Sequence, residues 1–143
     1  MSQKHIDEIR SFNRFYTDII GLVDQYILNS KYTLPEVRIM YELYHHENIR
    51  ASEIVSRIHI DKGYLSRMLV RFEKKKLISK KVVEHDGRSS LLFLTQKGKK
   101  EFEKLNLQSD KQIASIIQKI PAHDHDQLLY HLAEIKKIFQ HII

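Results

Sequence analysis

Cysteine is absent from the 143 residues of this sequence. Its absence excludes disulfides, thiolate metal ligands, cysteine redox sensing and Cys–His catalysis together, and it fits a reducing compartment. Long apolar runs are absent too, because none reaches the roughly 18 residues that a membrane-spanning helix needs. The first residues, MSQKHIDEIRSF, lack the apolar core of a signal peptide. We therefore expect a cytoplasmic protein with no membrane partner.

Glycine and proline are scarce, with 4 and 2 residues, which favours a chain that is mostly helical. Apolar residues at steps of three and four predict helices at both ends of the chain. Between them, Thr33, Asp61 and Thr95 are typical N-cap residues, and Thr33 with Glu36 forms the pattern of a capping box. The predicted helices run over about 4–28, from 33 to the HHEN at 45–48, and over 51–58, 62–76, about 95–119 and about 124–140.

Two short strands are predicted, LISKKVVE at 77–84 and SLLFL at 90–94, and Asp86-Gly87 between them is a tight-hairpin signal. The middle of the chain therefore reads as a helix-turn-helix followed by a β-wing. The outer helices hold more apolar residues than one small core needs, so we expect them to pair with a second copy of the chain. The expected fold class is mainly α with a small β-wing. It places a winged helix-turn-helix at 33–100 between dimerisation helices at 1–32 and 101–143, in one intertwined domain.

Positive charge is concentrated in the middle of the chain. The net charge is +6, and residues 50–100 hold 14 Lys/Arg against 5 Asp/Glu, a net of +9. The remaining residues hold 10 basic and 13 acidic side chains, a net of −3. A basic region between mildly acidic flanks points to a polyanionic partner, most simply nucleic acid.

The helix predicted over 62–76 divides into two faces at 100° per residue. Its apolar stripe, which we expect in the core, is Leu65, Met68, Leu69 and Phe72. Arginines on the other side can bind guanine with both guanidinium arms, and Val70 can touch a thymine methyl. Gly63 costs roughly 1 kcal/mol in a helix, but it lets the backbone approach DNA closely. The candidate DNA contacts are Lys62, Gly63, Tyr64, Ser66, Arg67, Arg71 and Lys74.

A solvated outer face would explain the same charges on this helix. The short helix before it, the tight turn at His59-Ile60, the basic region and the hairpin beyond it all favour DNA contact instead.

Residues 51–100 resemble the MarR family of bacterial winged-helix regulators. The family's wing signature is an Asp-x-Arg, then an apolar strand that ends in Leu-Thr, then a Lys-Gly pair. In this sequence the signature reads Asp86-Gly87-Arg88, Leu91 to Leu94, Thr95 and Lys97-Gly98. The segment YLSRMLVRFEKKKLI is similar to the family's recognition helix and the strand start that follows it. The flanking helices agree with the family's dimerisation domain in number and order.

The resemblance implies a homodimer that reads a pseudo-palindromic operator, as a repressor rather than an activator. Two recognition helices would enter successive major grooves about 34–36 Å apart. Arg88 would enter the minor groove, whose negative potential attracts arginine, and Asp86 would hold it in place. An incidental surface ion pair at a hairpin tip is worth only about 0–1 kcal/mol, so stability is a poor reason for these two residues.

The family's effectors are small, often aromatic or phenolic molecules that bind between the dimerisation helices and the DNA-binding lobe. By helix order, the residues that would line such a cleft here are Phe12, Tyr16, Arg38, Tyr41 and His45. Aromatic residues at helical spacing also fit an ordinary core. A ligand in the cleft can act only by binding the DNA-competent state and its alternative with different affinities.

Nine histidines keep open a metal-responsive regulator of the same fold, because some MarR relatives are zinc sensors. The segment PAHDHDQ at 121–127 combines imidazoles and carboxylates, but we expect it to be the capped start of a helix. Adjacent His45 and His46 point about 100° apart on a helix, so they do not easily share one metal. We predict no metal ligands and no cofactor.

No catalytic set stands out. The sequence has no glycine-rich phosphate loop, no nucleophile elbow and no paired carboxylates in an apolar setting. We therefore expect a sequence-specific double-stranded DNA-binding transcriptional regulator and not an enzyme. The alternative from a different class is a winged-helix module that binds a protein or RNA, and it predicts little dependence on duplex sequence.

Overall fold

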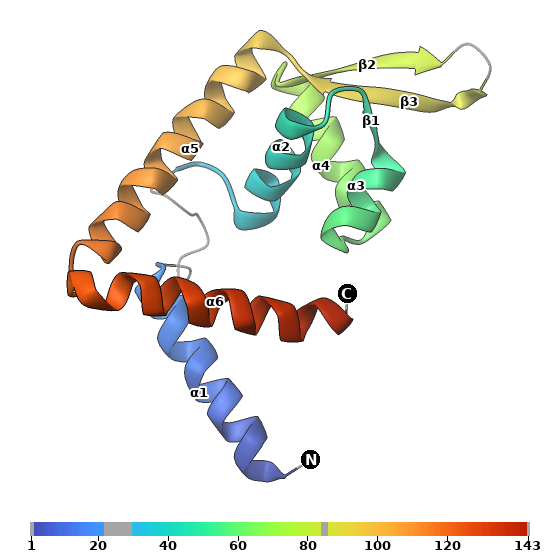
Figure 1. The fold of residues 1–143 in the computed structure, drawn as a ribbon. Helices are drawn as coiled ribbons and strands as arrows, with labels where there is room; N and C mark the ends of the chain where they lie inside the picture. Colours follow the sequence, from blue (N-terminus) through green and yellow to red (C-terminus); the bar gives the residue numbers. More distant parts are fainter. Residues whose placement is uncertain (1, 22–29, 84–85, 143) are drawn as a thin grey trace. The chain divides into compact units, whose positions relative to one another are not determined.

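The computed structural model describes residues 2–21, 30–83 and 86–142, and for residues 83 and 86–89 it describes the backbone alone. The fold is mainly helical with a small antiparallel sheet, as predicted (Figure 1). In chain order the elements are α1 (Gln3–Ile19), α2 (Leu34–His45), β1 (Ile49–Arg50), α3 (Ala51–Ile58), α4 (Lys62–Lys74), β2 (Ile78–Val83), β3 (Asp86–Leu94), α5 (Gln96–Ile117), η1 (Ala122–Asp124), α6 (His125–Phe139) and η2 (Gln140–Ile142). In the described part of the chain, no helix is both long and apolar enough to cross a membrane.

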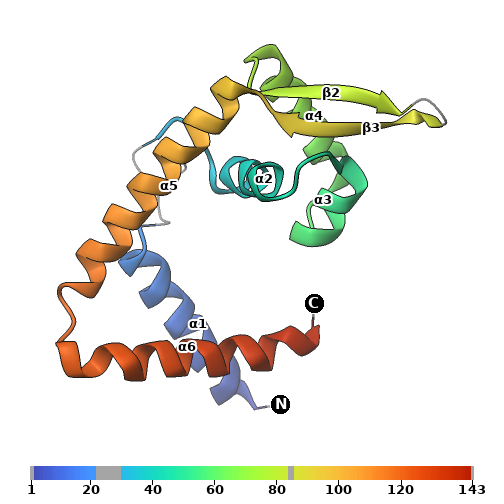
Figure 2. The same cartoon turned by 45° about the horizontal axis from the view of Figure 1, so that its top comes forward.

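The chain divides into two compact units. We call residues 21–109 the lobe, and residues 1–20 with 110–143 the terminal unit. Figures 1 and 2 show β2 and β3 of the lobe running out from α2, α3 and α4 as a hairpin. In the terminal unit, Gln112 Nε2 donates a hydrogen bond of 2.9 Å to the carbonyl oxygen of Ile20, just after α1.

The hydrophobic core lies in the lobe. Among the described residues it has sixteen buried apolar side chains, from Tyr32 to Leu105. They come from α2, α3, α4, the sheet and the start of α5, and from the connections before α2 and after α4. The Tyr32 hydroxyl donates to Glu101 Oε2 at 3.0 Å, and burial together with this bond raises the pKa of Tyr32. By contrast, α1 and α6, which are described over their whole lengths, contain no buried residue. The helices of the terminal unit therefore have apolar side chains but no core of their own.

The predicted helix starts are confirmed by their capping bonds. The Thr33 amide donates to Glu36 Oε2 at 2.8 Å, which is half of the expected capping box. Asp61 Oδ1 accepts from the Tyr64 amide at 2.7 Å, and Thr95 Oγ1 accepts from the Gly98 amide at 3.1 Å. These bonds satisfy amides that lack partners in a first helical turn.

Three predicted boundaries are wrong. The first helix, predicted over about 4–28, ends at Ile19, just before Gly21 with a φ of 65°. Residues 22–28 of that prediction lie outside the described residues. The helix predicted to reach residue 76 ends at Lys74, and Lys76 has a left-handed φ of 58°. Asp86 and Gly87, predicted to form the turn, belong to β3, which begins at Asp86. Residues 84–85, between β2 and β3, lie outside the described residues.

The sheet has a strand that sequence reasoning missed. Its order is β1-β3-β2, and β1 pairs antiparallel with β3 through Ile49 opposite Leu92. Both residues are buried, so this two-residue strand joins the start of α3 to the base of the hairpin. A two-residue strand shows no alternation of apolar and polar residues, so the sequence carries no signal for it.

Candidate nucleic-acid interface

The two faces predicted for α4 are confirmed. Leu65, Met68, Leu69 and Phe72 are buried. The exposed candidates are Lys62, Gly63, Ser66, Arg67, Val70, Arg71 and Lys74, and Tyr64 is half-buried. The guanidinium carbon of Arg67 lies 5.9 Å from the centroid of the Tyr64 ring, a cation–π contact that orients Arg67 along the helix surface.

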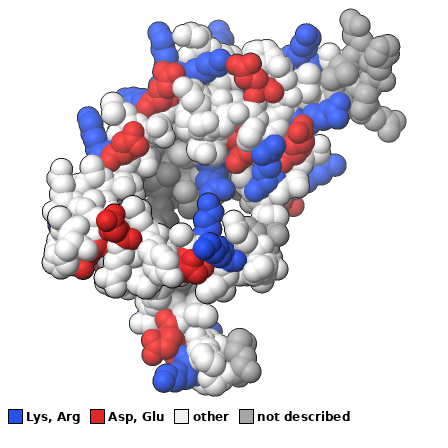
Figure 3. Space-filling model, viewed as in Figure 1, with Lys and Arg blue, Asp and Glu red and all other residues white. Residues whose placement is uncertain are grey.

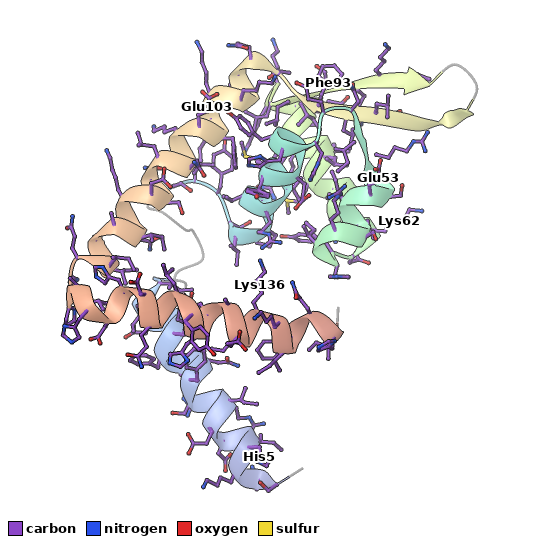
Figure 4. The ribbon with its side chains drawn as sticks, viewed as in Figure 1. His5, Glu53, Lys62, Phe93, Glu103 and Lys136 are labelled. Carbon is purple, nitrogen blue, oxygen red and sulfur yellow. The ribbon has the colours of Figure 1, made fainter. Side chains whose placement is uncertain are left out.

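A groove of about 580 Å³ runs between α3, α4 and the hairpin. Its lining residues are Arg50, Ala51, Ser52, Val55, Lys62, Leu65, Ser66, Leu69, Val70, Lys80, Ser90 and Leu92. Three of these side chains are basic and none is acidic. In Figure 4, Lys62 lies beside α3, on the side of the lobe where Glu53 is labelled. The groove therefore offers positive charge and hydroxyl groups to a ligand that lies along α4.

Sequence reasoning missed three of the groove's polar residues. Arg50 and Ser52 stand at the start of α3, and Lys80 comes from β2. Arg50 and Ser52 could have been found from their position at the first turn of the predicted helix-turn-helix, because amides and basic side chains there can bind phosphate. Lys80 also forms an ion pair of 2.7 Å with Glu73 of α4, so it holds the hairpin against the helix.

The end of α4 is fixed by a hydrogen-bonded joint formed by Thr95, Lys97 and Gly98. Lys97 Nζ donates to the Lys75 carbonyl at 2.8 Å, and Thr95 Oγ1 donates to the Lys76 carbonyl at 2.7 Å. These carbonyls follow the last helical residue, where helix ends lack partners. The Leu-Thr-x-Lys-Gly part of the wing signature therefore has a structural reason in this fold. It attaches α5 and the base of the hairpin to the end of α4.

Gly98 is required by the closeness of α5 to this joint. A Cβ on Gly98 would lie 2.0 Å from the carbonyl oxygen of Leu77. Gly63 differs, because a Cβ there would meet Asp61 Oδ1 at 3.3 Å and Arg67 Nη1 at 3.6 Å, which are ends of exposed side chains. The fold therefore demands glycine at position 98 and tolerates a side chain at position 63.

Arg71 forms an ion pair that the sequence did not predict. Its Nη2 lies 2.9 Å from Glu36 Oε1, and the Glu36 side chain is 1% exposed while that of Arg71 is 52% exposed. Because a buried carboxylate needs a partner, Arg71 has a structural role in addition to its place on the exposed face of α4. Among the other basic candidates of α4, the described structure gives no ion pair to Lys62, Arg67 or Lys74.

Acidic and basic side chains lie close to one another on the surface of the lobe. On the face in Figure 3, lysine and arginine side chains surround the hairpin and the start of α5, with acidic side chains between them. Glu47 and Lys99, for example, approach to 3.7 Å. The side chains of Asp86 and Arg88 lie outside the described ones, so their pairing stays a prediction.

A family model named MarR family matches residues 32–90, the segment that holds α2, the groove and most of the hairpin. This segment is therefore similar to the MarR family. An organic hydroperoxide resistance transcriptional regulator of Bacillus subtilis is 35% identical over 66 residues, which are 46% of this chain and 45% of that protein. The chain thus matches less than half of the length of this relative.

Two solved structures are similar to this fold. The DNA complex of Streptococcus pneumoniae FabT has a TM-score of 0.79 at 14% identity, over 99% of this chain and 100% of that one. The DNA complex of Staphylococcus aureus MepR has a TM-score of 0.70 at 19% identity, over 96% of this chain and 98% of that one. At these identities the likeness establishes the fold.

The residues predicted to line an effector cleft belong to both units. Phe12 and Tyr16 stack in α1 of the terminal unit, with ring centroids 5.7 Å apart. In the lobe, Tyr41 of α2 lies 4.3 Å from the His45 ring and 6.2 Å from the Phe102 ring. Each group is an aromatic cluster by itself, and a cleft between the two groups stays a prediction.

One histidine of the PAHDHDQ segment has a structural role. His125 Nε2 lies 3.0 Å from the carbonyl of Ile120 and 3.2 Å from that of Ile117, so it caps the end of α5. PAHDHDQ forms the start of α6, as predicted, with Asp124 as the N-cap residue and Asp126 in the first turn, although the Asp124 side chain makes no capping bond. Among the described residues, no three His, Cys, Asp or Glu side chains are grouped to hold a metal ion.

Proposed function

We propose that this protein is a repressor of transcription that binds a pseudo-palindromic operator in double-stranded DNA. The observation that carries the proposal is the exposed, mostly basic face of α4 beside a groove with three basic and no acidic side chains. The match of residues 32–90 to the MarR family model and the DNA-bound state of the FabT and MepR structures support it. In this proposal Ser66 and Arg67 read bases in the major groove, and Lys62, Arg50 and Lys80 bind phosphates.

We infer that the operator-binding form is a homodimer. Apolar side chains of α1 and α6 are exposed in the single chain, among them Phe15 at 62% and Ile138 at 68%. Exposed apolar patches of this kind mark protein interaction sites, and burying them removes apolar surface from water. A second copy of the same helices would supply the missing core of the terminal unit and repeat the reading helix for the second half of the operator.

The wing is tested by replacing Arg88 with alanine. We expect operator affinity to fall by about 1–3 kcal/mol, because the minor groove loses its arginine. The log–log slope of the binding constant against salt should flatten by about 0.9. Fluorescence anisotropy over a salt series measures both quantities, and thermal unfolding should not change.

Lys119→Ala is the matched control, since it removes one exposed charge from the terminal unit. Equal losses in the two variants would mean that only net charge matters. An unchanged dissociation constant for Arg88→Ala would refute the wing assignment.

The close approach of the start of α4 to DNA is tested by Gly63→Ala. We expect roughly tenfold weaker operator binding, or about 1.4 kcal/mol, because the methyl group would stand against the DNA backbone. The free energy of unfolding should stay the same or rise by up to about 1 kcal/mol, since alanine favours the helix. Urea unfolding and anisotropy measure the two effects. Binding equal to wild type would show that this backbone does not approach DNA.

We also propose that a small aromatic or phenolic effector releases the repressor. The proposal rests on the family resemblance and on the exposed rings of Tyr41 and His45, which lie against the buried ring of Phe102 in the lobe. Such a ligand must bind the DNA-incompetent state more tightly to shift the equilibrium. A metal-responsive version of the same regulator would instead show operator binding that changes with zinc and not with phenolic compounds.

A further inference from the structure

Arg71 differs from its neighbours on the exposed face of α4, because its charge is bound within the lobe. One oxygen of Glu36 accepts from Arg71 Nη2 at 2.9 Å. The other oxygen accepts from the amide and the hydroxyl of Thr33, at 2.8 and 3.1 Å. The buried carboxylate thus joins the start of α2 to the third turn of α4.

This link is in a position to control the placement of α4. Arg71 lies one turn beyond Arg67, on the same helix that carries the reading residues. The capping box fixes Glu36 at the start of α2, so the ion pair sets both the depth and the rotation of α4 against that helix. An arginine that leaves the carboxylate for DNA would abandon a charge in a site that is 1% exposed, which is unfavourable.

We propose that Arg71 is a positioning residue, which fixes the recognition helix through Glu36 and does not itself contact DNA. This inference rests on the proposed function and changes one part of it. From its place on the exposed face of α4 alone, Arg71 would be expected to contact a base or a phosphate. The inference also assigns a role in DNA affinity to Glu36, a residue that DNA cannot reach.

A double-mutant cycle separates the two roles. The variants are Arg71→Met, Glu36→Gln and both together, and glutamine preserves the capping box while it removes the charge. We expect each single variant to bind operator roughly tenfold more weakly, or about 1.4 kcal/mol. The double variant should bind no more weakly than either single variant, because both substitutions break one link.

The salt dependence of operator binding distinguishes a positioning role from a phosphate contact. A phosphate contact adds about −0.9 to the log–log slope, so a positioning role predicts wild-type slopes in all three variants. If Arg71→Met flattens the slope by about 0.9 while Glu36→Gln binds like wild type, Arg71 contacts DNA and the inference is wrong. Arg67→Met is the control that should flatten the slope or change the preferred bases.

Two further measurements keep the result unambiguous. Circular dichroism at the assay temperature checks folding. If Arg71→Met does not fold, the double variant is used for the test, because it leaves no unpaired buried charge. If the wild type prefers no duplex sequence, the proposed function fails. The same slopes on an arbitrary duplex then still decide whether Arg71 touches the phosphates.

Discussion

Alanine at Gly98 is expected to lower the free energy of unfolding by about 2–3 kcal/mol, because overpacking against a rigid backbone is costly. The added Cβ would lie 2.0 Å from the Leu77 carbonyl oxygen. That oxygen cannot simply move away, because it accepts a hydrogen bond of 2.9 Å from the Thr95 amide. The gain in helix propensity of roughly 1 kcal/mol offsets only part of the loss.

Urea unfolding of Gly98→Ala measures the change, and the melting temperature should fall by several degrees, at about 2–4 °C per kcal/mol for a chain near this size. Gly63→Ala is the matched control, since it makes the same substitution in the first turn of a helix where space exists. The two variants should differ in stability by at least about 2 kcal/mol. Equal stabilities would contradict the tight joint between α5 and the end of α4.

Glutamate at Leu132 is expected to abolish the dimer. Leu132 lies on the apolar face of α6 and is 40% exposed in the single chain. In a two-fold dimer the variant would place two unpaired carboxylates in an apolar interface, which costs several kcal/mol for each. Operator affinity should then fall by roughly 10²–10⁴, because the second half-site no longer gains from the effective concentration supplied by the first.

Sedimentation equilibrium measures the mass, which should change from twice 17.1 kDa in the wild type to 17.1 kDa in Leu132→Glu. Ala133→Glu is the control, because it introduces the same charge about 100° around the helix, on the polar side. Circular dichroism and the unfolding of the lobe distinguish a folded monomer from an unfolded chain. A monomeric wild type, or a dimeric Leu132→Glu, would refute the proposed interface.

The parts of this fold that follow from local chemistry could be predicted from the sequence. The buried stripe of α4 follows from the spacing of Leu65, Met68, Leu69 and Phe72, since each helical turn returns to the same face. The caps at Asp61 and Thr95 follow from residues whose side chains can accept from first-turn amides. The wing signature then indicated a resemblance to the MarR family, whereas periodicity alone left a solvated basic face as an alternative to DNA contact.

The missed features depend on partners that are distant in the sequence. Glu36 and Arg71 are 35 positions apart, so no spacing rule connects the capping glutamate of one helix with the exposed arginine of another. Lys97 contributes to the basic count, yet its charge caps the end of α4. Gly21 was a local signal for the end of α1, because glycine suits the positive φ found there. The apolar pattern outweighed that signal in the prediction.

Selection of bound duplexes from a random pool, followed by a salt titration of the winner, tests the central claim most directly. We predict a winner with two-fold symmetry, half-sites about one helical turn apart and a steep slope of affinity against salt. No enriched sequence, with only weak salt-sensitive binding, would contradict the account. The basic lobe would then provide general polyanion affinity, and the chain would be a winged-helix module for a protein or RNA partner.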